Sequence, residues 1–356
     1  MDNNRLLLLD ILEILQNSTD EDHHLTQQNI IEILEKNYGY EDVRRQTIKD
    51  NLEKLRKLDM KNFEIECNGE IERKVKDKKT GEEKESVIYT DFSYIHKFTK
   101  GELRLIIDSI LFSKHIDLSY RKKLIEKLES LASKYFKSGM NHIKALDNSN
   151  LGNKDLFLHI EELDKAITNS KKVSFNYVSH KFGEKATSLV ARENSQGEER
   201  KYSINPYYMV ASNGRYYLIC NNEPFKNVSS YRIDRIRNIE IVEEKRKPRR
   251  DIEGLGENFN LNEYMAEHIY MFGGESDYVK LSFKEEFLDE FIDWFGLDNI
   301  TFQEKKDEQI IVRVKTNKMA MRRWALRYAL YVRVLSPLDL VDEIKEDIQK
   351  AMKNYE

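Results

Sequence analysis

The chain is poor in cysteine, proline and glycine: its 356 residues include two, four and 14 of them, respectively. Cys67 and Cys220 are too few and too far apart for a disulfide framework or a zinc site, so we expect a protein of the reducing cytoplasm. The few prolines and glycines disfavour long disordered linkers. The sequence begins with polar residues and has no apolar run of about 18 residues, so we expect neither a signal peptide nor a membrane span.

The sequence also lacks a clear excess of either positive or negative charge. Lys and Arg number 59 and Asp and Glu number 63, which leaves a formal net charge of −4. The net charge therefore gives no support to nucleic-acid binding, and any such surface has to be a local patch. The length favours two or three domains, because single cores rarely grow beyond about 250–300 residues.

Motifs for catalysis and cofactor binding are missing from the sequence. It has no glycine-rich phosphate loop, no His-Glu-x-x-His, no Gly-x-Ser-x-Gly and no Cys/His cluster at metal-binding spacing. The adjacent His23 and His24 lie in an acidic stretch, where solvated histidines are more common than metal ligands. We therefore expect no enzyme, no catalytic residue, no cofactor and no metal.

Three short amphipathic helices are predicted in the first third of the chain. The first covers residues 4–17, the second follows the N-cap candidate Thr26, and the third runs from about residue 43 to 58. The apolar faces expected to be buried are Leu8, Ile11, Leu12 and Leu15 in the first helix, Ile30, Ile33 and Leu34 in the second, and Ile48, Leu52 and Leu55 in the third.

The opposite face of the third helix is rich in groups that contact nucleic acids. A third helix of this kind suits a domain that places it in the major groove of DNA. Arg and Gln would contact base edges there, and Lys would hold phosphates. The candidate DNA-binding residues are Gln46, Thr47 and Lys54 on this face, Lys49 beside it, and Arg44 and Arg45. By angle the two arginines lie toward the apolar side, but in the first turn long side chains can reach past the edge of the core. An ordinary three-helix bundle with a solvated charged face is the alternative.

Two strands and a helix pair are expected next. The strands cover residues 63–66 and 86–90, and the charged stretch 69–85 between them would form an enlarged wing with a turn at 78–81. A surface hairpin without a partner is the alternative.

Thr99 and Glu102 form a capping box for one helix. A second helix, over about 118–136, would bury Leu124, Leu128, Leu131 and Tyr135. The pair would be a dimer arm, or merely a rigid spacer.

The strongest local signal is the Asn213-Gly214 pair between two runs of β-branched and aromatic residues. Both positions of a type I′ turn need positive φ, so this pair predicts a β-hairpin in which Ser212 pairs with Arg215. One face of the hairpin would then carry Tyr207, Met209, Ala211, Tyr216, Leu218 and Cys220, and the other Tyr208, Val210, Ser212, Arg215, Tyr217 and Ile219.

Tyr216-Tyr217-Leu218, with the following segment 230–236, resembles the WYL domain, a β-barrel sensor module of bacterial transcription regulators. Tyr216 replaces the Trp of the signature, and the resemblance covers about residues 155–245. It implies an Sm/SH3-like barrel whose basic groove binds a nucleotide-like or nucleic-acid effector. Guanidinium groups hold phosphates bidentately, and aromatic rings stack on bases. The candidate effector-binding residues are Lys201, Ser203, Arg215, Tyr217, Tyr231, Arg232, Asp234 and Arg235. Alternatively, Tyr216, Tyr217 and Leu218 are barrel core and one arginine pairs structurally with Asp234.

The flanking segments extend this resemblance. Thr47-Ile48 with Leu52 and Leu55 is similar to the recognition helix that commonly precedes WYL domains, although Asp50-Asn51 replaces a frequent Arg-Asp pair. The segments 324–330 and 334–338 resemble the extension that follows WYL domains, which serves in dimerisation and in closing over the effector groove. A βαββαβ order over residues 278–335, with a last helix, predicts a ferredoxin-like fold there. Its Arg322, Arg323 and Arg327 would face a ligand or, alternatively, solvent.

Together these patterns predict an α+β multidomain protein. The expected parts are a winged helix-turn-helix DNA-binding domain (1–95), a helical connector (96–150), the WYL domain (151–247), a linker (248–277) and the carboxy-terminal extension (278–356). We expect a cytoplasmic, homodimeric transcriptional regulator that binds a double-stranded DNA operator and responds to a small anionic or nucleic-acid effector. The alternative is a nucleotide or nucleic-acid sensor whose amino-terminal part binds a protein partner.

Overall fold

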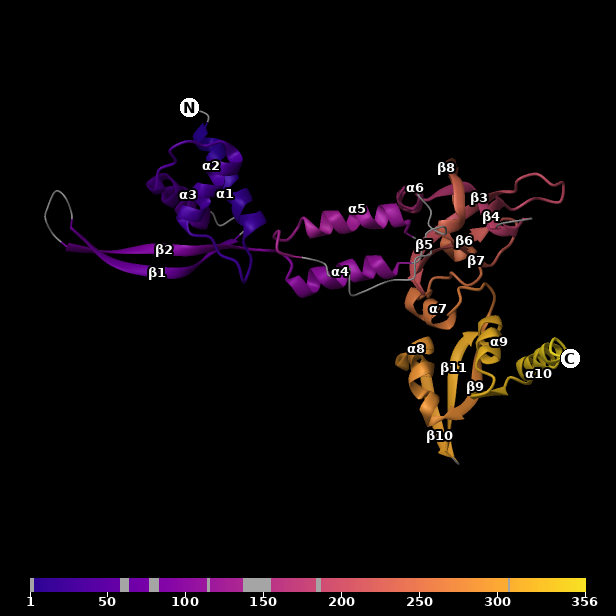
Figure 1. Cartoon of the computed structure of the whole chain (residues 1–356). Coiled ribbons are helices and arrows are strands. Elements are labelled where there is room, and N and C mark those ends of the chain that lie inside the picture. Colours follow the sequence, from indigo (N-terminus) through magenta and orange to yellow (C-terminus); the bar gives the residue numbers. More distant parts are fainter. Residues whose placement is uncertain are drawn as a thin grey trace. The chain divides into compact units, whose positions relative to one another are not determined.

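A computed structural model describes residues 3–57, 64–76, 83–113, 116–136, 155–183, 187–306 and 308–356. The chain divides into two compact units, Met1–Asn150 and Leu151–Glu356 (Figure 1). The predicted α+β class is confirmed. Unit 1 combines helices with a β-hairpin, and unit 2 holds a curled antiparallel half-barrel followed by a β/α domain.

Unit 1 contains five helices and one hairpin among its described residues. We call the part built from α1 (Asn3–Ser18), α2 (Gln27–Tyr38), α3 (Arg45–Lys57), β1 (Glu64–Lys76) and β2 (Glu83–Ile95) the head. The connector consists of α4 (Lys100–Phe112), α5 (Leu118–Glu129) and the turns up to residue 136. Thr26 caps α2 as predicted, and Thr99 forms the predicted capping box with Glu102 at α4.

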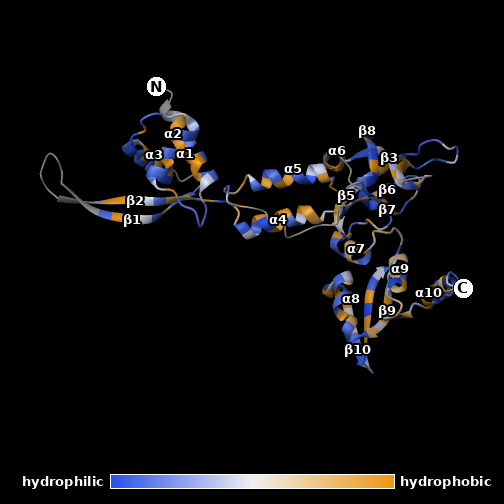
Figure 2. Cartoon of the chain, viewed as in Figure 1, coloured by the Kyte–Doolittle hydropathy of each residue, from blue (hydrophilic) through white to orange (hydrophobic). Residues whose placement is uncertain are grey.

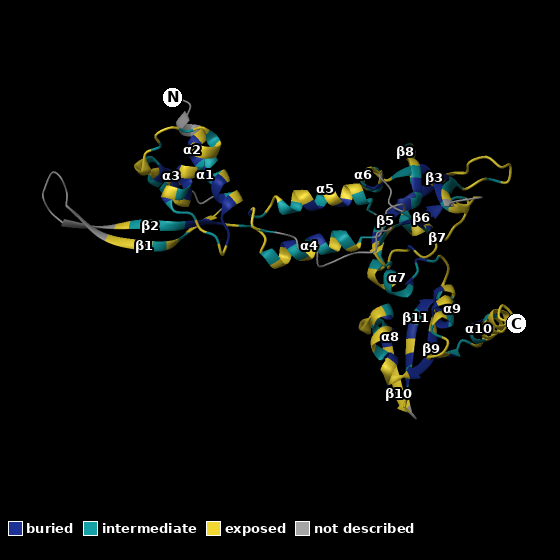
Figure 3. Cartoon of the chain, in the orientation of Figure 1, coloured by how far each residue is buried: buried dark blue, intermediate teal, exposed yellow. Residues whose placement is uncertain are grey.

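The apolar faces of the three head helices meet in one core. Ile48, Leu52 and Leu55 of α3 are buried there as predicted, together with Ile30 and Leu34 of α2. The prediction for α1 and α2 was partly wrong, because Leu8, Leu12 and Ile33 are only half-buried and Leu7, Ile14 and Ile31 take the core positions. Figure 3 shows these buried positions where the helices face one another.

The hairpin is longer than the two predicted strands. β1 and β2 pair from Glu64 with Ile95 out to Lys76 with Glu83, so most of the charged stretch 69–85 belongs to the strands. The predicted turn at 78–81 lies outside the described residues.

The connector helices have a small core of their own. Leu103 and Ile107 of α4 pack against Ile125 of α5, and both helices show alternating apolar and polar faces (Figure 2). The second helix ends at Glu129 rather than near residue 136. Leu131 and Tyr135, predicted to be buried, therefore lie beyond it and are 50% and 42% exposed.

Unit 2 opens with α6 (Leu156–Thr168) and an antiparallel sheet in the order β4-β3-β5-β6-β7, with β8 also paired to β3. Its strands are β3 (Lys171–Phe182), β4 (Thr187–Ala191), β5 (Lys201–Ser212), β6 (Arg215–Asn222), β7 (Val228–Arg232) and β8 (Ile236–Lys245). The predicted barrel is thus a curled half-barrel. A 3₁₀ turn, η1 (Ile233–Arg235), joins β7 to β8, and η2 (Arg249–Asp251) and α7 (Leu261–Glu267) follow.

The predicted hairpin register is confirmed. Ser212 pairs with Arg215 and Met209 with Leu218, and Asn213 and Gly214 have φ of 51° and 70°. The prediction of which face each residue occupies was wrong for Tyr207, which packs with Val210 and Ile219 instead of with Leu218. The register shifts between Pro206 and Tyr208, because proline has no N–H for the ladder and the strand bulges there.

The rest of unit 2 has the predicted βαββαβ order. It contains β9 (Ser276–Lys284), η3 (Glu285–Phe287), α8 (Leu288–Phe295), η4 (Leu297–Asn299), β10 (Ile300–Lys306), β11 (Gln309–Asn317), α9 (Lys318–Arg327), β12 (Val332–Ser336) and α10 (Leu338–Met352). The sheet order β10-β11-β9-β12, antiparallel throughout, is that of a ferredoxin-like fold. Trp324 lies in its core among Phe287, Phe291 and Phe295.

Candidate effector site and candidate DNA interface

Four aromatic rings from three strands form a packed cluster in the half-barrel, which we call the tyrosine cluster: Phe175 and Tyr177 on β3, Tyr202 on β5 and Tyr231 on β7. Neighbouring ring centroids lie 5.1 to 6.4 Å apart, mostly in edge-to-face geometry. All four rings are buried. Burial raises the pKa of the Tyr177 and Tyr231 hydroxyls. These rings therefore form a rigid base and offer little open face for a base to stack on.

Two arginines that the sequence did not single out lie over this cluster. The guanidinium carbon of Arg192 is 5.0 Å from the centroid of the Tyr177 ring, and that of Arg200 is 4.6 Å from the Tyr202 ring. Such cation–π contacts orient the planar group while leaving donors at its edge. The two-residue spacing of Phe175 and Tyr177 predicts two rings on one sheet face, but no local pattern places Arg192 and Arg200 above them.

Arg232 is held by Asp234. Its Nε donates to Asp234 Oδ1 at 3.0 Å and its Nη2 to Oδ2 at 2.5 Å, while its backbone N–H donates to the Tyr177 hydroxyl at 3.2 Å. Burial alone would lower the pKa of Arg232, but the interaction with Asp234 outweighs it and raises that pKa. The alternative in which one arginine pairs structurally with Asp234 is therefore what the structure shows for Arg232.

Arg215 and Arg235 have fewer hydrogen-bond acceptors and ion partners than Arg232 has. Arg215 Nη1 lies 3.5 Å from Asp234 Oδ2, yet this buried nitrogen makes no hydrogen bond to any described residue. Burial, and next the charge of Arg232, lower the pKa of Arg215. Arg235 is half-buried in η1 and forms neither a hydrogen bond nor an ion pair within the described part of the chain. An anion could take up these donors without breaking a native contact.

The remaining candidate effector residues are divided between two faces. Tyr217 is half-buried and pairs with Arg232 across β6 and β7. Lys201 and Ser203 flank the buried Tyr202 in β5 and face away from the tyrosine cluster, where Lys201 Nζ contacts Glu240 Oε2 at 2.6 Å. Of the residues whose burial in the core was the alternative, Leu218 is fully buried, whereas Tyr216 is 37% exposed.

The arginines of α9 are engaged within the carboxy-terminal domain. Arg322 donates to Asp347 and Glu343 of α10 and so ties the two helices together. Arg323 lies over the Phe272 ring, and Arg327 lies near the Trp294 and Tyr328 rings. These contacts within the domain explain the positions of all three arginine side chains, so no ligand has to be invoked for them.

Helix α3 presents a polar face opposite its buried one. Arg44, Arg45, Gln46 and Lys54 are exposed, and Thr47 and Lys49 are half-buried. Two of these side chains are positioned by neighbours. Arg45 Nε donates to Gln27 Oε1 at 3.3 Å, and Gln46 Nε2 donates to Asp50 Oδ1 at 2.8 Å. Lys49 Nζ lies 3.8 Å from Glu53, a weak exposed pair. Arg44, Arg45, Gln46, Thr47 and Lys49 thus lie at the amino-terminal end of α3, whereas Lys54 lies near its carboxy-terminal end.

Among the described residues, no three His, Cys, Asp or Glu side chains are arranged to hold a metal ion. The same part of the chain has no helix with the length and apolar character needed to span a bilayer.

Residues 159–241 match the WYL domain family and residues 275–352 match the WCX domain family. The chain therefore carries a WYL domain followed by a WCX domain, an architecture of the regulator type. The tyrosine cluster lies within the WYL match, as do Arg192, Arg200, Arg215, Arg232 and Arg235.

Two solved structures are similar over most of this chain. One is proteasome accessory factor B/C (PafBC) of Arthrobacter aurescens, at 12% identity and a TM-score of 0.27, covering 98% of this chain and 49% of that one. The other is a CRISPR Cas-related protein, at 15% identity and a TM-score of 0.37, covering 98% of this chain and 85% of that one. The chain spans about half the length of the PafBC chain. No curated protein matches the sequence.

Proposed function

We propose that the chain is a transcriptional regulator that binds duplex DNA through α3 and responds to an anionic effector, nucleotide-like or nucleic acid, bound at the WYL domain. The observation that carries this proposal is the exposed polar and basic face of α3. That face lies opposite a packed apolar one and is open to solvent, as a helix that enters a groove requires.

The side chains of α3 are of two kinds, some suited to base edges and others to phosphates. Arg45 and Gln46 are the residues for base edges, because Arg pairs bidentately with guanine and Gln with adenine. Lys54, more than two turns further along, is placed for a phosphate. In this proposal residues 1–95 form the DNA-binding domain, 96–150 the connector, 151–247 the sensor, 248–277 a linker and 278–356 the extension, and the protein works as a cytoplasmic homodimer.

The charge at the tyrosine cluster supports an anionic effector. Arg192 and Arg200 lie over rings of the cluster, and Arg215 and Arg232 lie within ion-pair distance of the buried carboxylate of Asp234, one residue before Arg235. Asp234 is engaged by Arg232 and Arg215, whereas Arg192, Arg200 and Arg235 form no ion pair with any residue that the structure describes. Guanidinium groups oriented over rings are suited to phosphate groups.

A second candidate function is binding of a protein partner by the head. Its support is that Asp50 lies on the exposed face of α3, where it holds Gln46, and that the first part of β1 carries four glutamates: Glu64, Glu66, Glu70 and Glu72. These carboxylates would repel DNA phosphates if the whole hairpin lay along a duplex.

The test is enrichment of duplex DNA from a random pool on the full chain, followed by binding measurements on the enriched sequence. We expect a specific sequence that Arg45→Ala binds about tenfold or more weakly. Lys36→Ala, an exposed lysine at the end of α2, is the matched control and should bind as the wild type does. Absence of any enriched duplex would favour the protein-partner function.

A further inference from the structure

The head and the connector are joined by polar contacts around a hollow space. Their buried apolar residues form separate clusters in the described part of unit 1. The joint between them consists of individual contacts. The backbone N–H of Lys134 donates to the Asn17 carbonyl at 2.8 Å, and the His23 ring stacks on the Tyr135 ring at 3.7 Å.

Asp20 is the centre of this joint. Its carboxylate accepts hydrogen bonds from the Ser133 hydroxyl at 2.6 Å and from the His23 ring at 2.7 Å, and Lys100 Nζ lies 3.7 Å away. Burial alone would raise the pKa of Asp20, but the hydrogen bonds from Ser133 and His23 hold it well below its ordinary value. Asp20 is therefore a satisfied anion that fixes the walls of the joint.

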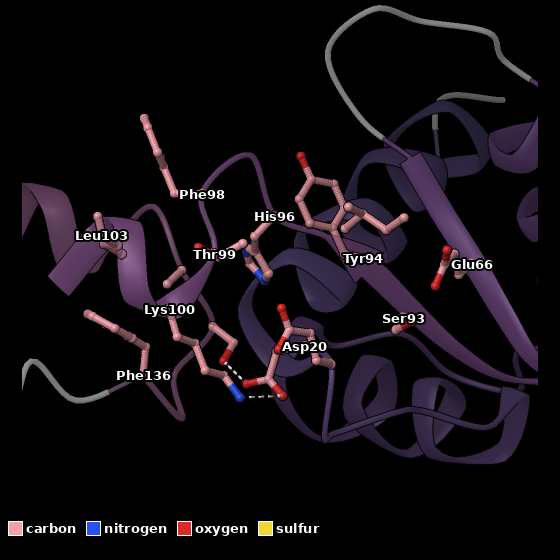
Figure 4. Close-up of a pocket in the computed structure, with 14 residues that line it drawn as sticks. Asp20, Glu66, Ser93, Tyr94, His96, Phe98, Thr99, Lys100, Leu103 and Phe136 are labelled. Carbon is pink, nitrogen blue, oxygen red and sulfur yellow. Dashed lines mark hydrogen bonds and ion pairs between the residues drawn. The ribbon is translucent and has the colours of Figure 1, made fainter. Parts of the chain in front are cut away.

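A cavity of about 230 Å³ lies beside Asp20 (Figure 4). Phe98, Leu103 and Phe136 form its apolar end on the connector side, and Glu66 lies toward the opposite end, on the hairpin. A second cavity of about 300 Å³ shares the Tyr94 and His96 side chains with the first. Both cavities open to solvent at the joint and are lined in part by exposed side chains, such as Phe98 and Glu66.

The cavity is lined by negatively charged side chains and by a tyrosine hydroxyl. Glu21 and Glu66 line the cavity and make no ion pair with a described residue, whereas Lys100 is taken up by Asp20 and Asp22. Tyr94 is only 7% exposed, and its hydroxyl forms no hydrogen bond to the residues that the structure describes. The cavity thus offers an apolar wall, free carboxylates and a hydroxyl.

We propose that this cavity is a binding site for a small molecule that carries one ring and a cationic amine. The ring would pack between Phe98, Leu103 and Phe136, and the ammonium group would lie toward Glu66. The volume is sufficient, because a cavity of about 150 Å³ already holds benzene. This site lies in unit 1 and is separate from the arginines of the WYL domain. A bound molecule would contact head and connector at once.

Benzylamine is the probe, with benzyl alcohol as its uncharged counterpart, and binding to the full chain is followed by ligand-observed NMR. We expect saturable binding of benzylamine at millimolar concentration and weaker binding of benzyl alcohol. Glu66→Gln should weaken benzylamine about threefold and leave benzyl alcohol unchanged, as expected for loss of one partly exposed charge pair. Glu70→Gln, on the same strand but outside the cavity, should leave both unchanged.

Ala132→Phe should abolish binding of both probes, because Ala132 lines both cavities and the added ring occupies them. Ala211→Phe, at an exposed position of β5, is the matched control. Absence of saturable benzylamine binding to the wild type, or equal benzylamine binding by the wild type and Glu66→Gln, would overturn the proposal even if Ala132→Phe fails to fold. The assay contains no DNA, so its outcome is independent of the proposed DNA binding.

Discussion

Arg232 and Asp234, two residues apart, form a two-point interaction in which both carboxylate oxygens accept from one guanidinium group. Asp234 is 5% exposed and also lies near Arg215, so one buried carboxylate holds two arginines beside the tyrosine cluster. This relationship changes the role expected for Arg232. We expect Arg232 to order the proposed site, and Arg235, Arg200 and Arg192 to contact the ligand.

Removal of Asp234 should therefore destabilise the site locally. Asp234→Ala leaves the half-buried Arg232 charge without its partner, and we expect a loss of about 2–3 kcal/mol in the local opening free energy, since breaking a buried pair costs about 3–5 kcal/mol and this one is partly exposed. Amide hydrogen exchange of β6 and β7 measures it. Glu240→Ala, which removes the exposed contact to Lys201, is the control and should cost less than about 1 kcal/mol. Unchanged exchange in Asp234→Ala would show that Arg232 is not anchored there.

Loss of a free arginine should weaken effector binding without loosening the fold. Arg235→Ala should bind a fluorescent single-stranded oligonucleotide about tenfold more weakly than the wild type, because a charge-assisted contact to phosphate is lost. Fluorescence anisotropy on the full chain measures this. Arg333→Ala, an exposed arginine of β12, serves as the control. If Arg235→Ala binds the oligonucleotide, and in a parallel assay a nucleoside diphosphate, as tightly as the wild type, the assignment of Arg235 is wrong.

The joint at Asp20 should make unit 1 sensitive to acid. The folded-state pKa of Asp20 is lowered from an ordinary value of 3.8, so the carboxylate contributes stability above that pH and loses it as the pH falls below it. Asp20→Asn should cost about 2 kcal/mol near neutral pH, and the difference from the wild type should shrink on acidification. Exchange of the slowest amides of α1 and α4 as a function of pH tests this. Asp293→Asn, at an exposed position, should show no such trend. A difference that stays constant across the titration would contradict it.

The sequence predicted the fold best where a short motif is compatible with a single backbone conformation. Asn213 and Gly214 determine a type I′ turn, and that turn sets the register of β5 and β6. The prediction failed at Tyr207, because the bulge that follows Pro206 is not visible in an alternating pattern. It also failed at α1, where Leu6 to Leu9 are all leucine and the periodicity cannot choose a face.

The candidate site could be predicted in part. Tyr217 and Arg232 come together because they are paired across the neighbouring strands β6 and β7, which one short connection joins. Arg192 and Arg200 could not be found, since their contacts depend on how the segment between β4 and β5 folds back over β3 and β5. Lys201 was grouped with the arginines because of its position in the sequence, but strand alternation turns it to the other face, toward Glu240.

The central claim, that α3 binds duplex DNA, is tested most directly by the salt dependence of binding to the enriched duplex. We expect log K to fall linearly with log salt concentration, with a slope of about −0.9 for each phosphate contacted, and Lys54→Ala to reduce the magnitude of that slope by about one. Lys36→Ala should leave it unchanged. An affinity that does not vary with salt, or a Lys54→Ala slope identical to that of the wild type, would contradict a phosphate contact by α3.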